Sequence, residues 1–471
     1  MFTKIALIYN GSFALCLKPG QLSLPMGLAQ LKAYLQQQNF QVQNLLLTNK
    51  LMADSSERNL LADFFVTNYV SNLEKWQRQD INQKIVAIIK KQLQQEFAPD
   101  LAIVGLSLMC FEDVLPTLYT ALALKELNSQ IIIVLGGAYL NLVNEEILAD
   151  NKNLLDFLVI GDGEKPLAEI LRQAADKNKL LAVPGLQFIY QDKVHSLPAQ
   201  YLSLEEMVLP DYDQENNQPQ IYYNFSRGCA GQCIFCCLKD KLRFKNIEQI
   251  KSELAELLKR YQPARLFFID ASANNNWPLL LEVLDYLEIL PVDFALALWL
   301  DFNNFPKQLI AGIKKYCQRK RLAVKFGLES GSVEMRNYLH KPKFSNEQVI
   351  DILQQLNTAG PNLQIHINVI ASIPYEKEEY FAQTLNLIEQ VKTLVTSVGV
   401  TVFQLTPFSL LWQNLDQYGL KLGEKSLNKY NFHYDYEEVA GLGQNEIRLR
   451  DQLYFQRLAE FLAKNNLGYD K

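Results

Sequence analysis

The chain has 471 residues, of which 49% are hydrophobic and 21% charged, and its formal net charge is −5. This is the composition of a globular protein with two or three domains, and no run of lysine and arginine stands apart from acidic residues to favour nucleic acid or an anionic membrane as partner. No apolar stretch approaches the ~20 residues of a membrane span. Seven cysteines without an export signal indicate a reducing, cytoplasmic location.

The first part of the chain alternates short apolar runs with amphipathic stretches, the pattern of parallel strands joined by helices. We predict a doubly wound α/β domain over residues 1–178, in which residues 54–98 form a polar helical insertion of no evident chemistry. The predicted strands and helices, in chain order, are 5–10, 25–38 (helix), 42–47, 100–108, 115–127 (helix) and 131–137.

The predicted strand ends of this domain carry glycine-rich loops, and doubly wound domains bind ligands at the carboxyl ends of their strands. Glycine would let the backbone approach a large ligand closely, although tight turns explain glycine pairs equally well. The glycines are Gly136, Gly137, Gly161 and Gly163, and Ser107 adds a hydroxyl.

Residues 179–217 read as a linker with a small β element, because hairpin-like runs give way to proline, asparagine and glutamine. A second α/β series over 218–406 predicts a parallel barrel, complete or open. The aromatic and polar segment 407–471 is predicted to be a small C-terminal subdomain. The expected barrel strands are 221–225, 265–270, 294–300, 323–330, 365–372 and 398–405.

Three cysteines, Cys229, Cys233 and Cys236, follow the first barrel strand with the spacing C-x3-C-x2-C. Loops at this end of a barrel face its active site, and closely spaced thiolates can hold an iron–sulfur cluster or zinc. A structural zinc usually takes four ligands in two pairs, and no second pair exists here. Cys237 matches no ligand position and is expected to pack as a neighbour of the ligands. The remaining cysteines stand alone and are expected as small buried hydrophobes: Cys16, Cys110 and Cys317.

These residues resemble the radical S-adenosylmethionine (SAM) superfamily, whose signature has an aromatic residue, here Phe235, before the last cysteine. The resemblance implies a [4Fe–4S] cluster on the three cysteines, with SAM bound to the fourth iron and in contact with Phe235. It also implies a partial (β/α)6 barrel, reductive cleavage of SAM, and an electron donor such as flavodoxin or ferredoxin. The cofactors would then perform the hard chemistry while the protein orients the reactants.

Two further segments are similar to motifs of this superfamily. FGLESGS, residues 326–332, combines an acid with small residues, which suits contact with a ribose; the resemblance assigns SAM contacts to Glu329 and Ser330, extending to Gly331 and Ser332. Residues 366–385 resemble the fifth-strand motif, with Ile370 to Pro374, Ser372 among them, on the adenine side. A buried strand ended by proline is the alternative interpretation.

The chain departs from the superfamily in two places. The usual Gly-Gly-Glu after the second strand is absent, and Asp270, Ser272 or Asn274 could supply the polar groups instead. The usual glycines near Pro374 are replaced by Ala371, Ser372 and Tyr375.

The first domain, with the linker hairpin, resembles the cobalamin-binding domain of cobalamin-dependent radical SAM enzymes. The motifs are LPMGLAQLKAYLQQQNFQV, PDLAIVGLSL, the LGG turn, DFLVIGDGEKPLAEIL and VPGLQFIYQDKVHSLP. The implied cobalamin contacts are Ser107, Leu108, Gly136, Gly137, Gly161, Gly163 and Glu164. No Asp-x-His-x-x-Gly loop exists, and His195, His340, His366 and His433 are expected outside the first sheet, so no histidine is predicted below the cobalt.

The function that this resemblance implies is methyl transfer from methylcobalamin to an unactivated carbon of a small-molecule or peptide substrate. The alternatives are a radical rearrangement or cyclisation without methyl transfer, and a corrinoid-binding protein that has lost catalysis. An aromatic group could stack a substrate, although such residues in a C-terminal segment are more often core. The group comprises Tyr212, Trp299, Trp412, Tyr418 and residues 430–436.

Overall fold

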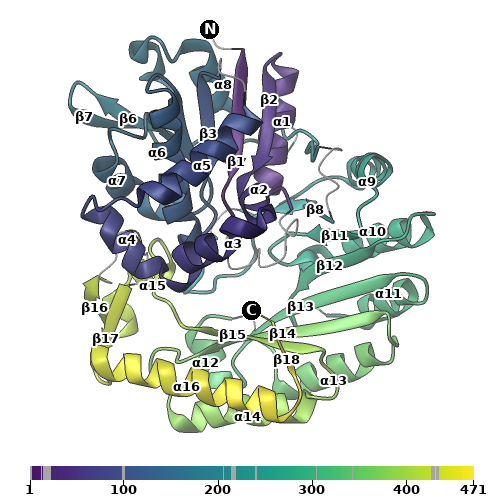
Figure 1. Ribbon diagram of the computed structural model, residues 1–471. Helices are drawn as coiled ribbons and strands as arrows, with labels where there is room; N and C mark the ends of the chain where they lie inside the picture. Colours follow the sequence, from purple (N-terminus) through teal and green to yellow (C-terminus); the bar gives the residue numbers. More distant parts are fainter. Residues whose placement is uncertain are drawn as a thin grey trace. The chain divides into compact units, whose positions relative to one another are not determined.

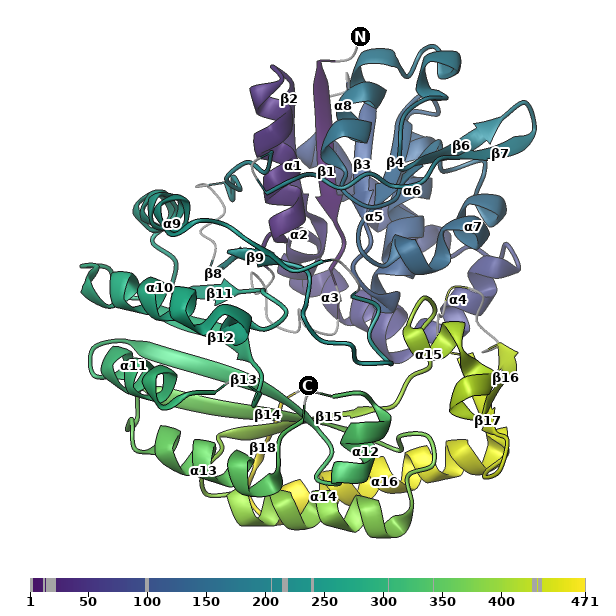
Figure 2. The ribbon, with the colours of Figure 1, turned by 180° about the vertical axis from the view of Figure 1, so that it is seen from behind.

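The structure is a computed structural model, which describes residues 3–11, 13, 23–97, 101–204, 206–213, 219–238, 241–303, 305–341, 343–425, 430 and 434–470. It divides into two compact units, each built around a seven-stranded sheet (Figures 1 and 2). The first unit comprises Met1–Pro219 and Leu427–Phe432, and the second comprises Gln220–Ser426 and His433–Lys471. Within the described residues, no helix combines the length and apolarity needed to cross a membrane.

The sheet of the first unit has the strand order β2-β1-β3-β4-β5-β6-β7. Its first five strands are parallel, whereas β6 and β7 form an antiparallel hairpin added to the edge at β5. The strands are β1 Lys4–Tyr9, β2 Gln41–Leu46, β3 Ile103–Ser107, β4 Ile132–Gly136, β5 Phe157–Val159, β6 Leu186–Tyr190 and β7 Lys193–Ser196. The predicted doubly wound fold is confirmed.

Helices cover this sheet in two groups, and α6 is buried around most of its circumference. Helices α5 and α6 pack together, as do α1 and α8 (Figures 1 and 2). The helices are α1 Met26–Gln37, α2 Leu47–Ala53, α3 Ser55–Ala62, α4 Tyr69–Gln77, α5 Gln83–Glu96, α6 Val114–Leu127, α7 Leu140–Asp150 and α8 Glu164–Gln173. Short helical turns occupy Asp63–Thr67, Phe111–Asp113 and Lys177–Leu180.

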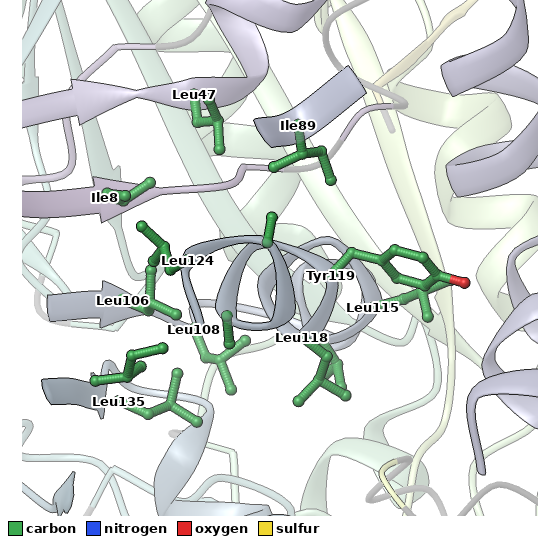
Figure 3. Packing of buried hydrophobic residues seen from close by; sticks show 14 of the residues in the cluster. Ile8, Leu47, Ile89, Leu106, Leu108, Leu115, Leu118, Tyr119, Leu124 and Leu135 are labelled. Carbon is green, nitrogen blue, oxygen red and sulfur yellow. The ribbon is translucent and has the colours of Figure 1, made fainter. Parts of the chain in front are cut away.

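The core of the first unit lies between the parallel strands and helix α6. Figure 3 shows Leu115, Leu118 and Leu124 of α6 among the buried side chains of the cluster that also includes Ile8 and Leu106 from the strands. The uninterrupted apolar runs of the strands follow from this burial, since parallel strands are covered on both faces.

The segment over 54–97 is helical, as predicted, but it is part of this core, and the prediction that it is polar was wrong. It forms most of the crossover from β2 to β3. Its helices are amphipathic, and their buried faces carry Phe64, Phe65, Trp76 and Ile89, each no more than 7% exposed. The polar faces dominate the sequence composition and hide these apolar positions, which recur at helical spacing.

The second sheet is entirely parallel, with the order β18-β15-β14-β13-β12-β11-β8. Six strands follow the chain in order, which confirms the predicted partial (β/α)6 barrel, and a seventh strand from the chain end adds to β15. The strands are β8 Gln220–Tyr223, β11 Arg265–Phe268, β12 Ala295–Leu300, β13 Arg321–Glu329, β14 Leu363–Ala371, β15 Ser397–Val402 and β18 Gly468–Asp470.

Helices of the second unit follow one another along this sheet, from α9 to α14, and α16 packs on α14 (Figure 2). They are α9 Ile247–Tyr261, α10 Trp277–Ile289, α11 Lys307–Cys317, α12 Val333–Tyr338, α13 Asn346–Asn357, α14 Glu378–Val391, α15 Leu410–Gln413 and α16 Gln444–Lys464, with 3-10 turns at Ala273–Asn276 and Leu415–Tyr418. Two hairpins complete the unit: β9 Ser226–Arg227 with β10 Arg243–Phe244, and β16 Leu420–Lys425 with β17 Tyr434–Glu438.

Two segments that the sequence sets apart are built into the units. The hairpin β6–β7 of the predicted linker extends the first sheet, so His195 lies on the edge strand β7 rather than outside that sheet; its Nε2 is 2.9 Å from the Leu181 carbonyl oxygen. Most of the segment 407–471 belongs to the second unit, where α16 packs against β14, β15 and β17.

Candidate active site

The cysteine loop begins where the first strand of the second sheet ends. After β8, residues Ser226 and Arg227 pair with Phe244 and Arg243 in the β9–β10 hairpin, and Lys245 N donates to the Phe225 carbonyl at 2.9 Å. Gly228, with φ 83°, turns the chain into the loop in a conformation that favours glycine. The hairpin therefore closes the base of the loop and fixes the direction in which its cysteines leave the sheet.

Cys229, Cys233 and Cys236 line one cavity of about 260 Å³. A side chain at Gly231 would lie 3.3 Å from Cys229 Sγ and 3.7 Å from Cys233 Sγ, so glycine leaves the space between these sulfurs open. Gly231 N donates to Cys229 Sγ at 3.3 Å, and Leu238 N donates to Cys236 Sγ at 3.4 Å. Backbone donors of this kind stabilise thiolates, the form that binds iron. Cys237 is absent from the cavity lining, and because it is exposed at the surface, the expectation that it packs was wrong.

Burial raises the pKa of Cys233 to about 11, and the nearby ammonium of Lys341 opposes that rise. Burial also raises the pKa of Cys236, where the hydrogen bond from Leu238 N acts in the opposite direction. Both thiols are therefore protonated at neutral pH without metal. Iron binding must displace these protons, which couples the assembly of a cluster to pH.

Ile234, between the cysteines, is fully buried and clips the loop to two other elements. Its N–H donates to the Leu339 carbonyl at 3.0 Å, and its own carbonyl accepts from Leu411 N at 2.9 Å. Leu339 follows α12, whereas Leu411 lies in α15 of the C-terminal segment. The position of the cysteines thus depends on residues more than 100 positions away in the sequence.

Charged groups occupy the same cavity as the cysteines. Lys341 Nζ lies 3.1 Å from Glu329 Oε1 and 3.2 Å from Asp301 Oδ2, and its side chain is 10% exposed. Glu329 ends β13 with φ 63°, an unusual conformation for a residue other than glycine. The neighbouring carboxylates Glu329 and Asp301 raise the pKa of Lys341 against the effect of its burial. The lysine is therefore a cation throughout the physiological range.

Asn274 connects the loop after β11 with the loop after β12. Its Nδ2 donates to the carbonyls of Asp301 and Asn303 at 2.9 and 3.2 Å, and its Oδ1 accepts from Asp301 N at 2.9 Å. Ser272 Oγ donates to the same Oδ1 at 2.9 Å. These bonds hold Asp301 in place beside Lys341.

The residues predicted to contact SAM separate into two groups. Phe235 and Glu329 line the cavity with the cysteines. Three others are buried and bonded within the protein, and their SAM roles stay predictions. Asp270 accepts from Phe225 N and Ser226 N, Ser330 Oγ lies 3.1 Å from Thr384 Oγ1, and Ser372 Oγ accepts from Arg450 Nε. Of the replacements considered for Gly-Gly-Glu, Ser272 and Asn274 reach the cavity.

Gly331 and Ser332 have structural reasons for their identity. A side chain at Gly331 would lie 2.6 Å from the Gln383 carbonyl oxygen, so this glycine is needed for the approach of α14. Ser332 caps α12 through a bond from Met335 N. The sequence missed Lys341, Asp301 and Asn303; the position of Asp301 directly after β12 was the available signal, whereas Lys341 follows a helix and carried none.

In the first unit, the loops after β3 and β4 contact each other. Gly137 has φ 106°, and a side chain there would lie 2.2 Å from the Leu108 carbonyl oxygen. Leu108 N donates to the Gly136 carbonyl at 2.8 Å, and Tyr139 N donates to the Leu108 carbonyl at 3.1 Å. The requirement for glycine at 137 is therefore explained by the protein's own backbone.

The loop after β5 shows the same feature. Gly161 has φ 84°, and its Cβ would lie 2.8 Å from Ala199 Cβ; Gly163, before α8, faces Leu31 at 3.1 Å. The backbone at 136, 137, 161 and 163 remains partly exposed, whereas Ser107, Leu108 and Glu164 are buried. This strip of accessible backbone at the carboxyl edge fits a large ligand such as a corrinoid, and the individual contacts stay predictions.

The remaining predicted residues lie away from the cavity lining. Trp412 and Tyr434 pack together in the core of the C-terminal segment, Tyr212 is fully buried, and Lys325 Nζ lies 5.6 Å from the centre of the Trp299 ring. Tyr430 belongs to the first unit, where its carbonyl accepts from Tyr139 Oη at 2.8 Å. Cys110 is half-buried and Cys317 is buried. Cys16 and residues 431–433, His433 among them, lie outside the described residues.

The three thiols and the space beside them fit a [4Fe–4S] cluster. Among the side chains that the structure describes, no three of His, Cys, Asp or Glu are spaced to hold one metal ion. The three thiols nevertheless open into one cavity with room beside them. Sulfur ligands around a shared space are the requirement of a [4Fe–4S] cluster, in which three thiolates can each bind one iron and leave the fourth iron open.

Two protein families match the chain. The B12 binding domain family matches residues 14–171, and the radical SAM superfamily matches residues 223–388. An uncharacterised methyltransferase of Pyrococcus horikoshii is 22% identical over 344 residues, which cover 70% of this chain and 71% of the relative. A tRNA-2-methylthio-N(6)-dimethylallyladenosine synthase of Thermodesulfovibrio yellowstonii is also 22% identical, over 60% of this chain and 61% of that protein.

Solved structures share the fold of the whole chain. The cobalamin-dependent SAM radical enzyme OxsB, with aqua-cobalamin and SAM bound, gives a TM-score of 0.70 at 14% identity and covers 98% of this chain and 67% of its own. The radical SAM methyltransferase TsrM from Kitasatospora setae, with cobalamin and a [4Fe–4S] cluster bound, gives 0.64 at 14% identity, over 92% of this chain and 85% of its own. At such identities the likeness concerns the fold alone.

Proposed function

Since the chain is a cobalamin-dependent radical SAM enzyme, with a B12 binding domain followed by a radical SAM domain, we propose that it transfers a methyl group from cobalamin to an unactivated carbon of a small-molecule or peptide substrate. When bound, the cluster and SAM supply hydrogen-atom abstraction, and cobalamin supplies the methyl group. An electron donor such as flavodoxin or ferredoxin would serve the cluster. The names of the Pyrococcus relative and of TsrM, both methyltransferases, support methyl transfer.

The chain's own residues would bind and orient these groups. Cys229, Cys233 and Cys236 would each ligate one iron, which leaves a fourth iron free for SAM. Lys341 would attract the carboxylate of SAM, while Glu329 and Asp301 would accept from its amine or ribose hydroxyls. Glu329 and Asp301 also keep Lys341 charged when SAM is absent.

One observation carries this proposal: the three thiols of the signature share a cavity with Lys341, Glu329 and Asp301, whose side chains are 10%, 12% and 18% exposed. A cavity that served only a structural metal would need no buried lysine held between two carboxylates. Burying such charges is costly unless they are paired or bind a ligand of opposite charge.

The test is product analysis of the anaerobically reconstituted protein with a one-electron reductant, cobalamin and SAM carrying a labelled methyl group. Methyl transfer requires both 5′-deoxyadenosine and S-adenosylhomocysteine, with label entering the cobalamin. If 5′-deoxyadenosine forms without S-adenosylhomocysteine, the methyl-transfer proposal fails and a rearrangement or cyclisation takes its place. If cobalamin binds but neither product forms, the chain is a corrinoid-binding protein without catalysis.

A further inference from the structure

The turn after β14 holds two residues in a conformation that is rare without glycine. Ser372 has φ 60° and Tyr375 has φ 61°, both in the left-handed region. A side chain there crowds the backbone, so such residues persist only where the surroundings impose the conformation. The turn lies at the carboxyl end of the strand, the edge at which ligands bind in parallel sheets.

Glu376 holds the turn from within. Its Oε2 accepts from Ser372 N at 2.7 Å and from Ile373 N at 3.3 Å, and the carboxylate is buried. These bonds tie the first residues of the turn to its end. They leave the side chain of Ser372 and the backbone of Tyr375 to be held by other elements.

An ion pair from the C-terminal segment supplies both remaining contacts. Arg450 of α16 donates from Nε to Ser372 Oγ at 2.9 Å, and its Nη2 lies 2.9 Å from Glu438 Oε1 of β17. The same Glu438 oxygen accepts from Tyr375 N at 2.7 Å. The pair is nearly inaccessible, with side chains 7% and 3% exposed. One ion pair thus contacts both left-handed residues.

A buried ion pair contributes little net stability, because the loss of hydration offsets the attraction between the charges. Its advantage is directional: Arg450 Nε and a Glu438 oxygen each form a hydrogen bond to the turn, whereas Arg450 Nη2 faces Glu438 as a charge contact without a hydrogen bond. Here those bonds end on Ser372 and Tyr375, where glycine would otherwise be the favoured residue. The arrangement therefore fixes a conformation rather than adding to the apolar core.

We infer that Arg450 and Glu438 are positioning residues, which hold the turn 372–376 in the conformation that binds SAM. The inference rests on the proposed function, because it takes this turn as the adenine side of the SAM site. Without the pair, the turn would relax from its left-handed residues and only a fraction of molecules would be competent to bind. The apparent affinity falls by that fraction, about tenfold if one molecule in ten keeps the conformation.

The experiment compares Arg450→Met with Arg450→Met combined with Ser372→Gly. Glycine adopts the left-handed region at no steric cost, so it should restore the turn without restoring the ion pair. Arg448→Met is the matched control, since Arg448 lies on the same helix but pairs with Asp435 at the surface. SAM affinity is measured by equilibrium dialysis on the reconstituted protein, and hydrogen exchange of residues 369–378 is measured without SAM.

We expect Arg450→Met to weaken SAM binding about tenfold and to speed exchange in this segment, and the added Ser372→Gly to bring affinity back to within about threefold. Unchanged affinity in Arg450→Met overturns the inference. So does weakened affinity that glycine fails to restore in a protein with wild-type circular dichroism. If Arg450→Met does not fold, Glu438→Gln, which keeps the size of the side chain, replaces it with the same expected results.

Failure of the proposed function is distinguishable from failure of this inference. If the wild-type protein binds SAM but yields no 5′-deoxyadenosine, the catalytic proposal fails while the affinity and exchange comparisons still decide the role of Arg450. If the wild type cleaves SAM and Arg450→Met behaves as Arg448→Met does, the positioning role fails alone.

Discussion

The loops after β3 and β4 in the first unit and the loops after β8, β12 and β13 in the second lie at the same edge of their sheets, but they are built differently. In the first unit, Gly137 brings the backbone of one loop against Leu108 of the next. In the second, side chains from separate loops surround a cavity with three thiols and Lys341, whose side chain is 10% exposed. The edge in the first unit therefore consists of closely packed backbone, whereas the edge in the second unit carries reactive and charged side chains.

The difference shows how far each kind of sequence signal can be interpreted. A glycine marks close approach without saying what approaches, and at 137 and 161 the neighbour is the protein itself. A clustered thiol or buried charge has few structural uses and therefore points to a ligand. The cysteine signature was correspondingly informative, whereas the glycine loops depended on resemblance for their meaning.

The two edges also share a device, a buried carboxylate that ties the loop after a strand. Asp113 Oδ2 accepts from Met109 N and Cys110 N, and Asp270 Oδ1 accepts from Phe225 N and Ser226 N. Their other oxygens have no hydrogen-bond partner among the described residues. Burial raises the pKa of each carboxyl to about 7.

The largest effect should come from the thiols. Replacing Cys229, Cys233 or Cys236 by alanine removes a cluster ligand and should lower 5′-deoxyadenosine formation by more than about 10³-fold, as expected when an essential cofactor is lost. Cys237→Ala should retain activity and iron, because its side chain lies outside the cavity. Iron and sulfide content checks the cause. All three variants are also expected to retain cobalamin. Loss of cobalamin would mean that cobalamin binding by the first unit depends on the cluster ligands of the second.

Gly137→Ala should destabilise the contact between the loops after β3 and β4 in the first unit. A methyl group would meet the Leu108 backbone in a left-handed conformation, and we expect a loss of about 3 kcal/mol in the free energy of unfolding. Gly136→Ala is the matched control, because its side chain would lie 3.8 Å from the nearest atom. Urea unfolding measures both. Equal stability of the two variants would contradict the account of this edge.

The shared carboxylates predict how stability depends on pH. The pKa of Asp113 and of Asp270 is raised from 3.8 to about 7 in the folded protein. Their contribution to the free energy of unfolding is therefore complete below pH 4 and is lost as the pH rises towards 7. Asp270→Asn should remove a decline on the order of 2 kcal/mol between pH 5 and pH 7. Unfolding at several pH values tests this, and a wild-type slope in the variant would show that Asp270 is ionised when folded.

Lys341→Met tests whether the charged group in the second unit contributes to SAM binding. Loss of the cation should weaken SAM binding about tenfold, since a charged hydrogen bond is worth about 1.5 kcal/mol or more. Lys343→Met, two residues away and exposed, is the control. Equilibrium dialysis at constant ionic strength gives both constants. If Lys341→Met and Lys343→Met bind SAM equally well, Lys341 does not contact SAM, and its ion pair with Asp301 has only a structural role in the wild-type protein.

The sequence predicted both sheets because apolar periodicity reports local burial, and the strands β1 to β4, β8 and β11 to β15 were recognised in this way. It did not predict that residues 54–98 enter the core, since their apolar positions are spaced within polar helices. Phe235 and Glu329 were predicted through motifs. Lys341, Arg450 and Glu438 were missed because their partners lie in other elements, and only the fold brings a lysine after α12 beside an acid after β12.

The central claim is that the three thiols and the charged group around Lys341 form one site that cleaves SAM. Its most direct test is the yield of 5′-deoxyadenosine from reduced, reconstituted wild-type protein and from Cys233→Ala under the same anaerobic conditions. We predict steady formation by the wild type and background amounts from the variant. Equal yields from the two proteins, or none from a wild type that carries a full complement of iron and sulfide, would contradict it.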